Sequence, residues 1–141
     1  MIRKASAVWN GNLRDGKGTV TTESGVLAQT PYSFRSRFET GTGTNPEELI
    51  AAGHAGCFAM ALSAQLTGAG LTPDTIATSA ALTLEKLDAG WTVTKIHLDV
   101  TARVPGATSE TFQKLAAEAK ANCPISRLLK AEITMTATLS N

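Results

Sequence analysis

The sequence predicts an α+β fold in which a mostly antiparallel sheet wraps around a central buried helix. Segments in which apolar and more polar residues alternate, as half-buried strands do, stand near both ends of the chain and in its middle. A long stretch without a formally charged residue, 49–67, fits a helix that protein surrounds. Short turns containing glycine separate neighbouring strands, which favours antiparallel pairing.

The first third of the chain is predicted to form three strands. Alternation over 5–9 ends at the Asn10-Gly11 turn, and a second turn at 15–18 precedes a strand at 19–22. The segment 32–38 is predicted as the third strand. On that reading Phe34, Ser36 and Phe38 share one face, whereas Arg35, Arg37 and Glu39 share the other.

A helix is predicted to start after the loop 41–44. Asn45 suits the N-cap and Pro46 the first helical position. Glu48 stands three residues after the cap, as in a capping box. The helix should run to about Thr67, before Gly68 and Gly70. Because apolar and small residues lie on all its sides, we expect a core helix covered on all sides rather than a membrane span.

The second half predicts a hairpin, two helices and a last strand. Alternating segments at 76–84 and 96–104 flank a turn at 88–90. Helical spacing of apolar residues follows over 109–121, and Cys123-Pro124 opens a short further helix. Alternation returns at 133–139. No repeat or linker interrupts the order β-β-β, α, β-β, α-α, β, so residues 1–141 are expected to form a single domain.

Composition limits the classes of function. The chain has 141 residues, 43% of them hydrophobic and 18% charged, with a net charge of +1. Without a basic patch or acidic tail, neither nucleic acid nor a membrane is an expected partner. No signal peptide is visible at the start, so a cytoplasmic protein is expected. The two cysteines have neither CxxC nor zinc-site spacing.

Both cysteines have settings that favour thiol chemistry without compelling it. Free cysteine often serves as buried filler, but Gly53 and Gly56 remove bulk just before Cys57, so that a backbone or substrate could approach. Cys123 precedes Pro124 and so lies near a helix N-terminus, where a thiolate is stabilised.

Three further residues could take part in chemistry. Arg37 could be an ordinary solvated strand residue. His54 lies three residues before Cys57, and it could be a packing residue, raise the thiolate content of Cys57, or bind a metal. Glu47 complements the helix dipole but is not required by the capping box, so it is freer for another role.

The segment TNPEELIAAGHAGCFAM, 44–60, resembles the signature of the OsmC/Ohr family of organic hydroperoxide reductases. NCPIS at 122–126 is similar to the second cysteine motif of that family. Three more segments, 16–27, 31–39 and 129–134, resemble its OsmC branch, so the similarity covers nearly the whole chain.

The resemblance implies a role for each of four residues and offers one alternative for the arginine. Cys57 matches the peroxidatic cysteine, Cys123 the resolving cysteine, Glu47 the acidic residue of the NPE segment, and Arg37 the arginine of the OsmC branch; Arg14 is a weaker candidate, by analogy with the Ohr branch. It further implies an intertwined homodimer that uses an external dithiol reductant and no metal, flavin or haem cofactor.

On this reading the Cys57 thiolate attacks an organic hydroperoxide and Cys123 then forms a disulfide with it, while Arg37, held by Glu47, lowers the pKa of Cys57. Glu47 and Cys57 are ten residues apart, which is ~15 Å of rise on one helix. We therefore expect Arg37 and Glu47 of one subunit to complete the pocket around Cys57 of the other. Two alternatives are a non-catalytic stress-related binding module, and a redox or metal sensor using Cys57, Cys123 and perhaps His54.

Overall fold

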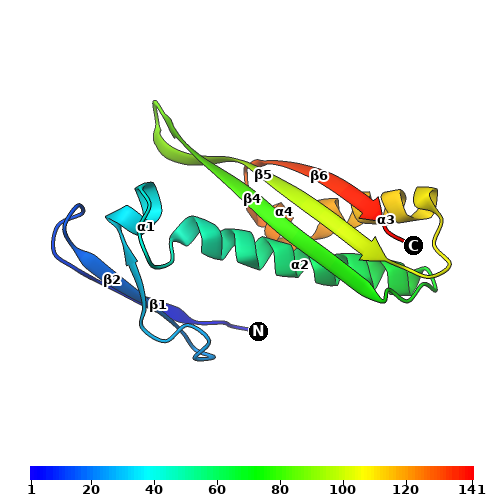
Figure 1. Cartoon of the computed structure of the whole chain (residues 1–141), viewed down its shortest axis with the longest axis horizontal. Coiled ribbons are helices and arrows are strands. Elements are labelled where there is room, and N and C mark those ends of the chain that lie inside the picture. Colours follow the sequence, from blue (N-terminus) through cyan, green and yellow to red (C-terminus); the bar gives the residue numbers. More distant parts are fainter. The chain divides into compact units, whose positions relative to one another are not determined.

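The computed structural model describes residues 1–141, which form two compact units, residues 1–49 and residues 50–141. Each unit contains one three-stranded sheet, and helices accompany both sheets (Figure 1). All strand pairs but one are antiparallel. The predicted α+β class is confirmed.

The first unit contains an antiparallel sheet in the order β1-β2-β3, formed by Ala5–Asn10, Lys17–Thr22 and Thr30–Ser33. Gly18 pairs with Trp9 on one side and Tyr32 on the other. A Cβ at Gly18 would collide with both aromatic rings, so glycine is required for this close approach. The two rings meet there, with centroids 5.3 Å apart.

The predicted strand at 32–38 is wrong, because the strand ends at Ser33 and helix α1, Phe34–Phe38, follows it. Ser33 and Ser36 make a reciprocal capping box: the Ser36 N–H donates to Ser33 Oγ at 3.2 Å, and the Ser33 N–H to Ser36 Oγ at 2.9 Å. A spacing of four residues puts Phe34 and Phe38 on one face of a strand, but it also puts them on adjacent turns of a helix. Their ring centroids lie 5.0 Å apart. Arg37 is therefore a helical residue.

Helix α2, Pro46–Gly68, begins as predicted. The Glu48 N–H donates to Asn45 Oδ1 at 2.8 Å, as an N-cap requires. The Glu48 carboxylate, however, accepts a hydrogen bond from Thr44 Oγ1 at 2.6 Å. Glu48 therefore bonds to the residue before the N-cap, whereas a capping box would have it bond to the backbone N–H of Asn45.

The expectation that α2 is covered on all sides is wrong for the single chain. Its buried side chains recur every fourth residue, at His54, Phe58, Leu62 and Leu66. On the opposite face Met60 is 77% exposed, and a Cβ at Gly53 or Gly56 would meet no atom within 4 Å. Length and composition alone would let α2 cross a membrane, although a core helix meets the same criterion. The sequence is apolar all round, but the chain itself covers only one stripe.

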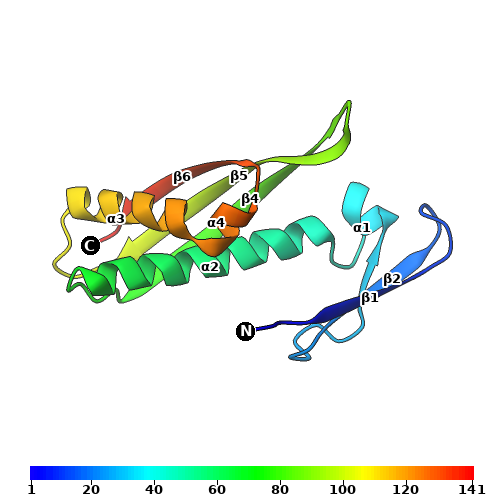
Figure 2. The ribbon, with the colours of Figure 1, turned by 180° about the vertical axis from the view of Figure 1, so that it is seen from behind.

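The second unit packs helices on one face of a three-stranded sheet. Strand β4, Thr75–Leu87, pairs antiparallel with β5, Gly90–Arg103, and β5 pairs parallel with β6, Glu132–Leu139. Helix α3, Ser109–Asn122, and the part of α2 from Ile50 onward cover the same face of this sheet (Figures 1 and 2). The short helix α4, Pro124–Leu128, follows α3 directly.

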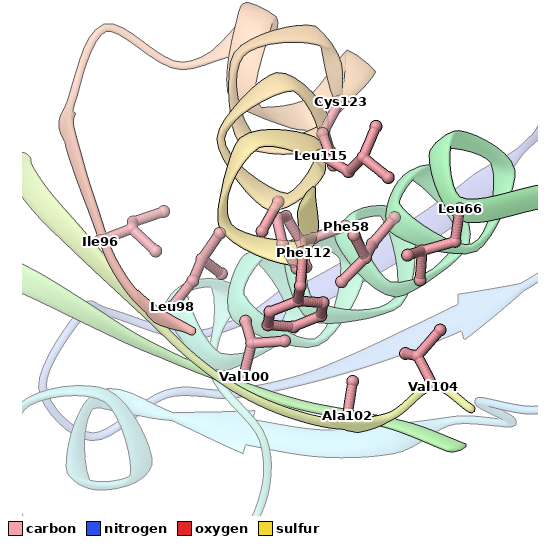
Figure 3. Packing of buried hydrophobic residues seen from close by; sticks show 13 residues of the cluster. Phe58, Leu66, Ile96, Leu98, Val100, Ala102, Val104, Phe112, Leu115 and Cys123 are labelled. Carbon is pink, nitrogen blue, oxygen red and sulfur yellow. The ribbon is translucent and has the colours of Figure 1, made fainter. Parts of the chain in front are cut away.

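The core lies between this sheet and these helices. Alternate residues from Ile96 to Ala102 of β5, and Val104 just after its end, point toward α2 and α3 (Figure 3). Phe112 of α3 lies among them with Phe58 of α2, and both rings are fully buried. Cys123 belongs to the same buried cluster. The core therefore fixes the helices that carry both cysteines.

Candidate active site

The two cysteines, 66 residues apart in sequence, meet in the second unit. Cys57 lies on α2 and Cys123 between α3 and α4, and their sulfur atoms are 2.9 Å apart. Both are free thiols; Cys123 is completely buried, whereas Cys57 is partly exposed. A disulfide needs a sulfur–sulfur distance of about 2.05 Å, so a shift of about 1 Å would allow the bond to form. Cys57 is the more exposed of the two cysteines.

The backbone around Cys123 holds its thiol in place. The Cys123 N–H donates to the Ala119 carbonyl at 2.9 Å and so closes the last turn of α3. Its own carbonyl accepts the Arg127 N–H at 3.0 Å in the first turn of α4. Because Pro124 cannot continue the hydrogen-bonding pattern of α3, the chain bends at Cys123 and turns into α4.

The two thiols have opposite tendencies to ionise. Burial raises the pKa of Cys57, and its hydrogen bond to Cys123 raises it further. Burial also disfavours the Cys123 thiolate, but hydrogen bonds from Cys57, Ser126 and Ile125 outweigh it and lower the pKa of Cys123. Within residues 50–141, the negative charge is therefore favoured on Cys123. No cation is among the groups acting on Cys57, so the low pKa expected for Cys57 is not produced within this unit.

Arg37 and Glu47 form an ion pair in the first unit. Arg37 Nη2 donates to Glu47 Oε1 at 2.7 Å, and Nε lies 3.1 Å from both carboxylate oxygens. The Glu47 side chain is 14% exposed and that of Arg37 35% exposed. This is the fork-like pairing expected from the sequence, and it holds the guanidinium in one orientation. Arg37 also lies 5.0 Å from the centroid of the Phe38 ring.

An aromatic pocket lies beside this arginine. A cavity of about 240 Å³ is lined mainly by Trp9, Leu13, Tyr32, Phe34 and Phe38, together with Arg37. A larger hollow of about 550 Å³, near Arg3 and Lys4, contains none of the predicted site residues. The pocket was not predicted from the sequence, because Phe34 and Phe38 were expected on a strand and lie on helix α1 instead.

Arg14 lies outside this cavity, in the turn between β1 and β2. Its guanidinium carbon is 6.0 Å from the centroid of the Phe34 ring. The side chain of Arg37, by contrast, lines the cavity and is fixed by a carboxylate. Of the two arginines, Arg37 therefore has the setting that anchors a positive charge beside an apolar pocket.

His54 is a titratable residue close in sequence to Cys57. It is completely buried, and its Nε2 lies 2.8 Å from Ser126 Oγ. Burial lowers the pKa of His54, so the ring is neutral at pH 7, and its Nδ1 has no hydrogen-bond partner. No group of three or more His, Cys, Asp or Glu side chains is arranged to hold a metal ion. The metal-sensor alternative therefore finds no ligand set in this structure.

The fold and the site define a class of dithiol protein: an α+β chain with two free cysteines whose sulfur atoms face each other, one on the long helix α2 and the other between α3 and α4. Residues 39–138 match the family model of OsmC-like proteins. The chain belongs to the OsmC-like family.

Relatives and solved structures agree with this assignment. The chain is 55% identical to peroxiredoxin OsmC of Escherichia coli (strain K12), over 94% of this chain and 93% of the relative. It is 32% identical to an organic hydroperoxide resistance protein of Xanthomonas axonopodis pv. citri, over 71% of this chain and 69% of the relative. Its fold resembles that of an OsmC-like protein from Mycoplasma pneumoniae, with a TM-score of 0.79, 16% identity, and coverage of 100% and 99% of the two chains.

Proposed function

We propose that this protein is a thiol-dependent peroxidase that reduces organic hydroperoxides to alcohols. The observation that carries the proposal is the 2.9 Å approach of the Cys57 and Cys123 sulfur atoms. It occurs in a family whose members include proteins named for peroxiredoxin activity and for organic hydroperoxide resistance. The chain has only two cysteines, and both are free. If they served only to fill space in the core, their thiols would not need to face each other.

The first step is attack by the Cys57 thiolate on the terminal peroxide oxygen. The O–O bond breaks, and the sulfur takes that oxygen with its hydrogen as a sulfenic acid. The remaining alkoxide takes a proton from water and leaves as the alcohol. The sulfur is oxidised by two electrons and the peroxide is reduced by two, so this step needs no metal, flavin or haem.

The second step is attack by Cys123 on the sulfenic sulfur of Cys57. The S–O bond breaks, a disulfide forms, and the departing hydroxide takes up a proton to become water. An external dithiol then reduces the disulfide by exchange and restores both thiols. Because the pKa of Cys123 is lowered, the attacking sulfur carries negative charge at a lower pH than an ordinary thiol does.

The first step needs a cation that residues 50–141 do not place at Cys57. We propose that Arg37, oriented by Glu47, comes from the partner subunit of a homodimer and lowers the pKa of Cys57 there. Ten helical residues separate Glu47 from Cys57 on α2, about 15 Å of rise. The uncovered face of α2, with Gly53, Gly56 and Met60, offers a surface on which a second copy can pack closely.

The aromatic pocket beside Arg37 supports an organic substrate. An apolar substituent would bury its surface against the Phe34 and Phe38 rings while the peroxide group lies near the guanidinium. Hydrogen peroxide has no apolar substituent and would gain nothing from these rings. We therefore propose a preference for alkyl or aryl hydroperoxides over hydrogen peroxide. A cytoplasmic location suits the two free thiols, because that compartment keeps cysteine reduced.

A peroxide-consumption assay tests the proposal. Reduced parent, Cys57→Ser and Cys123→Ser proteins would be mixed with cumene hydroperoxide or hydrogen peroxide, with dithiothreitol as reductant. The proposal predicts turnover by the parent, faster with cumene hydroperoxide, and none by Cys57→Ser. Cys123→Ser should consume about one equivalent and then stall or become over-oxidised. Equal rates for all three proteins would leave a non-catalytic binding module as the better account.

A thiol redox sensor would form the same disulfide but would not turn over. Repeated cycles of peroxide consumption per protein molecule therefore distinguish the peroxidase from the sensor. A light-scattering mass of one chain at working concentration would contradict the homodimer.

A further inference from the structure

The hydrogen bond between His54 and Ser126 joins the same two segments that the two thiols join. His54 precedes Cys57 by three residues on α2, and Ser126 follows Cys123 by three residues in α4. One cross-connection joins His54 Nε2 to Ser126 Oγ at 2.8 Å, and the other joins the two sulfur atoms at 2.9 Å. Two helical segments are thus connected at two points, each one turn from the other.

The buried position of His54 lowers the stability of the fold. The side chain is completely buried, and its Nδ1 has no partner. An unpartnered buried nitrogen disfavours folding, whereas an apolar residue at this position would not carry that cost. The His54–Ser126 bond is therefore the observation that explains a histidine in this stripe of α2, whose other buried residues are Phe58, Leu62 and Leu66.

The Ser126 hydroxyl also acts on the Cys123 thiol. Ser126 assists the Cys123 thiolate through both its backbone N–H and its hydroxyl. A hydroxyl has a single hydrogen, so when Ser126 donates to Cys123 its oxygen must accept from His54. That arrangement requires neutral His54 to carry its proton on Nε2, which leaves Nδ1 as the bare nitrogen.

We propose that His54 is a positioning residue for the disulfide-forming step: through the Ser126 hydroxyl it holds the Cys123 turn against α2, so that Cys123 meets the sulfenic acid of Cys57. This inference rests on the proposed peroxidase function and deepens it. In the step it serves, the Cys123 sulfur bonds to the Cys57 sulfur, the S–O bond breaks, and hydroxide leaves as water after taking up a proton. In this role His54 acts through Ser126 and takes no part in making or breaking a bond.

The test separates the two chemical steps. Reduced protein would be mixed rapidly with one equivalent of cumene hydroperoxide and quenched at intervals, and mass spectrometry would count sulfenic acid, disulfide and sulfinic acid at Cys57. For Ser126→Ala and His54→Gln we expect sulfenic acid to form at the parent's rate. Disulfide formation should be about tenfold slower, which is the effect of losing one such hydrogen bond. With excess peroxide, more of Cys57 should reach the sulfinic acid.

Two further variants separate positioning from general damage to the fold. Ser126→Thr keeps the hydroxyl and should restore disulfide formation. His97 is the other histidine of this unit that contacts hydroxyl groups, with Nδ1 2.6 Å from Thr134 Oγ1 and Nε2 3.3 Å from Thr136 Oγ1. His97→Gln should leave both steps unchanged. A merely destabilised protein would not change the ratio of the two rates.

The outcomes are distinguishable from failure of the proposed function. Disulfide formation at the parent's rate in both Ser126→Ala and His54→Gln would overturn the inference and leave the peroxidase intact. Ser126→Ala decides the matter alone if His54→Gln does not fold. A parent protein that forms no sulfenic acid at Cys57 would overturn the proposed function itself.

Discussion

The two units of the chain differ in what they bury. Residues 50–141 enclose a continuous apolar cluster around Phe58 and Phe112, whereas residues 1–49 bury no apolar side chain. In the first unit the buried side chains are those of Ser36 and Thr44, and Val8, Leu13 and Val26 remain exposed. The second unit therefore carries its own stability. The first unit has no comparable core, so its apolar residues contribute little burial to its stability.

The chemistry is divided in the same way. The second unit contains both thiols, and in it the pKa of Cys57 is raised. The first contains the fixed guanidinium and the aromatic pocket. Neither unit has all the parts of the proposed reaction, which is why the proposal takes Arg37 from a partner subunit.

The largest expected effect concerns stability. Phe58→Ala would open a cavity in the core of the second unit and lower the free energy of unfolding by about 3–5 kcal/mol. Val26→Ala, at an 84% exposed residue of the first unit, should change it by less than about 0.5 kcal/mol. Urea denaturation of both variants measures the difference. Equal losses would mean that the two units do not differ in this respect.

The next effect concerns the rate of the first chemical step. Arg37→Met removes the guanidinium, and the oxidation of Cys57 by cumene hydroperoxide should slow by about 10²–10³-fold, as for the loss of one strong donor at a site of developing charge. Absorbance at 240 nm should show thiolate formation at higher pH in this variant, since a nearby cation favours the anion.

Arg35→Met is the matched control for that variant. Arg35 lies on the same helix but is 72% exposed and pairs with Glu39 at 3.6 Å. An exposed pair of this kind contributes little, so the rate should stay close to that of the parent. If the two arginine variants were equally slow, a specific role for Arg37 would be lost.

Elements whose local sequence signals agree with the tertiary structure could be predicted from the sequence, but α1 could not. The hairpin of β4 and β5, helix α3 and the start of α2 after the Asn45 cap were all predicted, although β5 begins at Gly90, before the predicted segment 96–104. The prediction failed at α1 because Phe34 and Phe38 satisfy both a two-residue and a four-residue period; the capping box of Ser33 and Ser36 decides for the helix.

The site was less accessible from the sequence than the fold. The paired cysteines and the Arg37–Glu47 ion pair could be anticipated, but Ser126 carried no separate signal within its motif. Only the equal three-residue spacing from His54 to Cys57 and from Cys123 to Ser126 could have suggested it. The exposed face of α2 could not be foreseen, because the residues alone do not say which apolar face the same chain covers.

The smallest expected effect concerns pH. The pKa of His54 is below its ordinary value of 6.5 in the folded protein, so below pH 6.5 the unfolded chain binds a proton that the folded chain does not. Acidification below that pH should therefore lower the free energy of unfolding, by up to about 1.4 kcal/mol per pH unit for one proton. His54→Gln should lose this part of the pH dependence. Denaturation curves between pH 5 and 7, a window chosen around the ordinary histidine pKa, would show whether the parent and the variant differ.

Complementation between two inactive variants tests the division of the site most directly. Cys57→Ser keeps Arg37, and Arg37→Met keeps Cys57. After subunit exchange in an equal mixture, each mixed dimer would contain one complete site if Arg37 acts across the interface. The expected result is the return of peroxidase activity to about a quarter of the parent's, since half the dimers are mixed and each has one of two sites intact. A mixture with no more activity than its separate components would contradict the account.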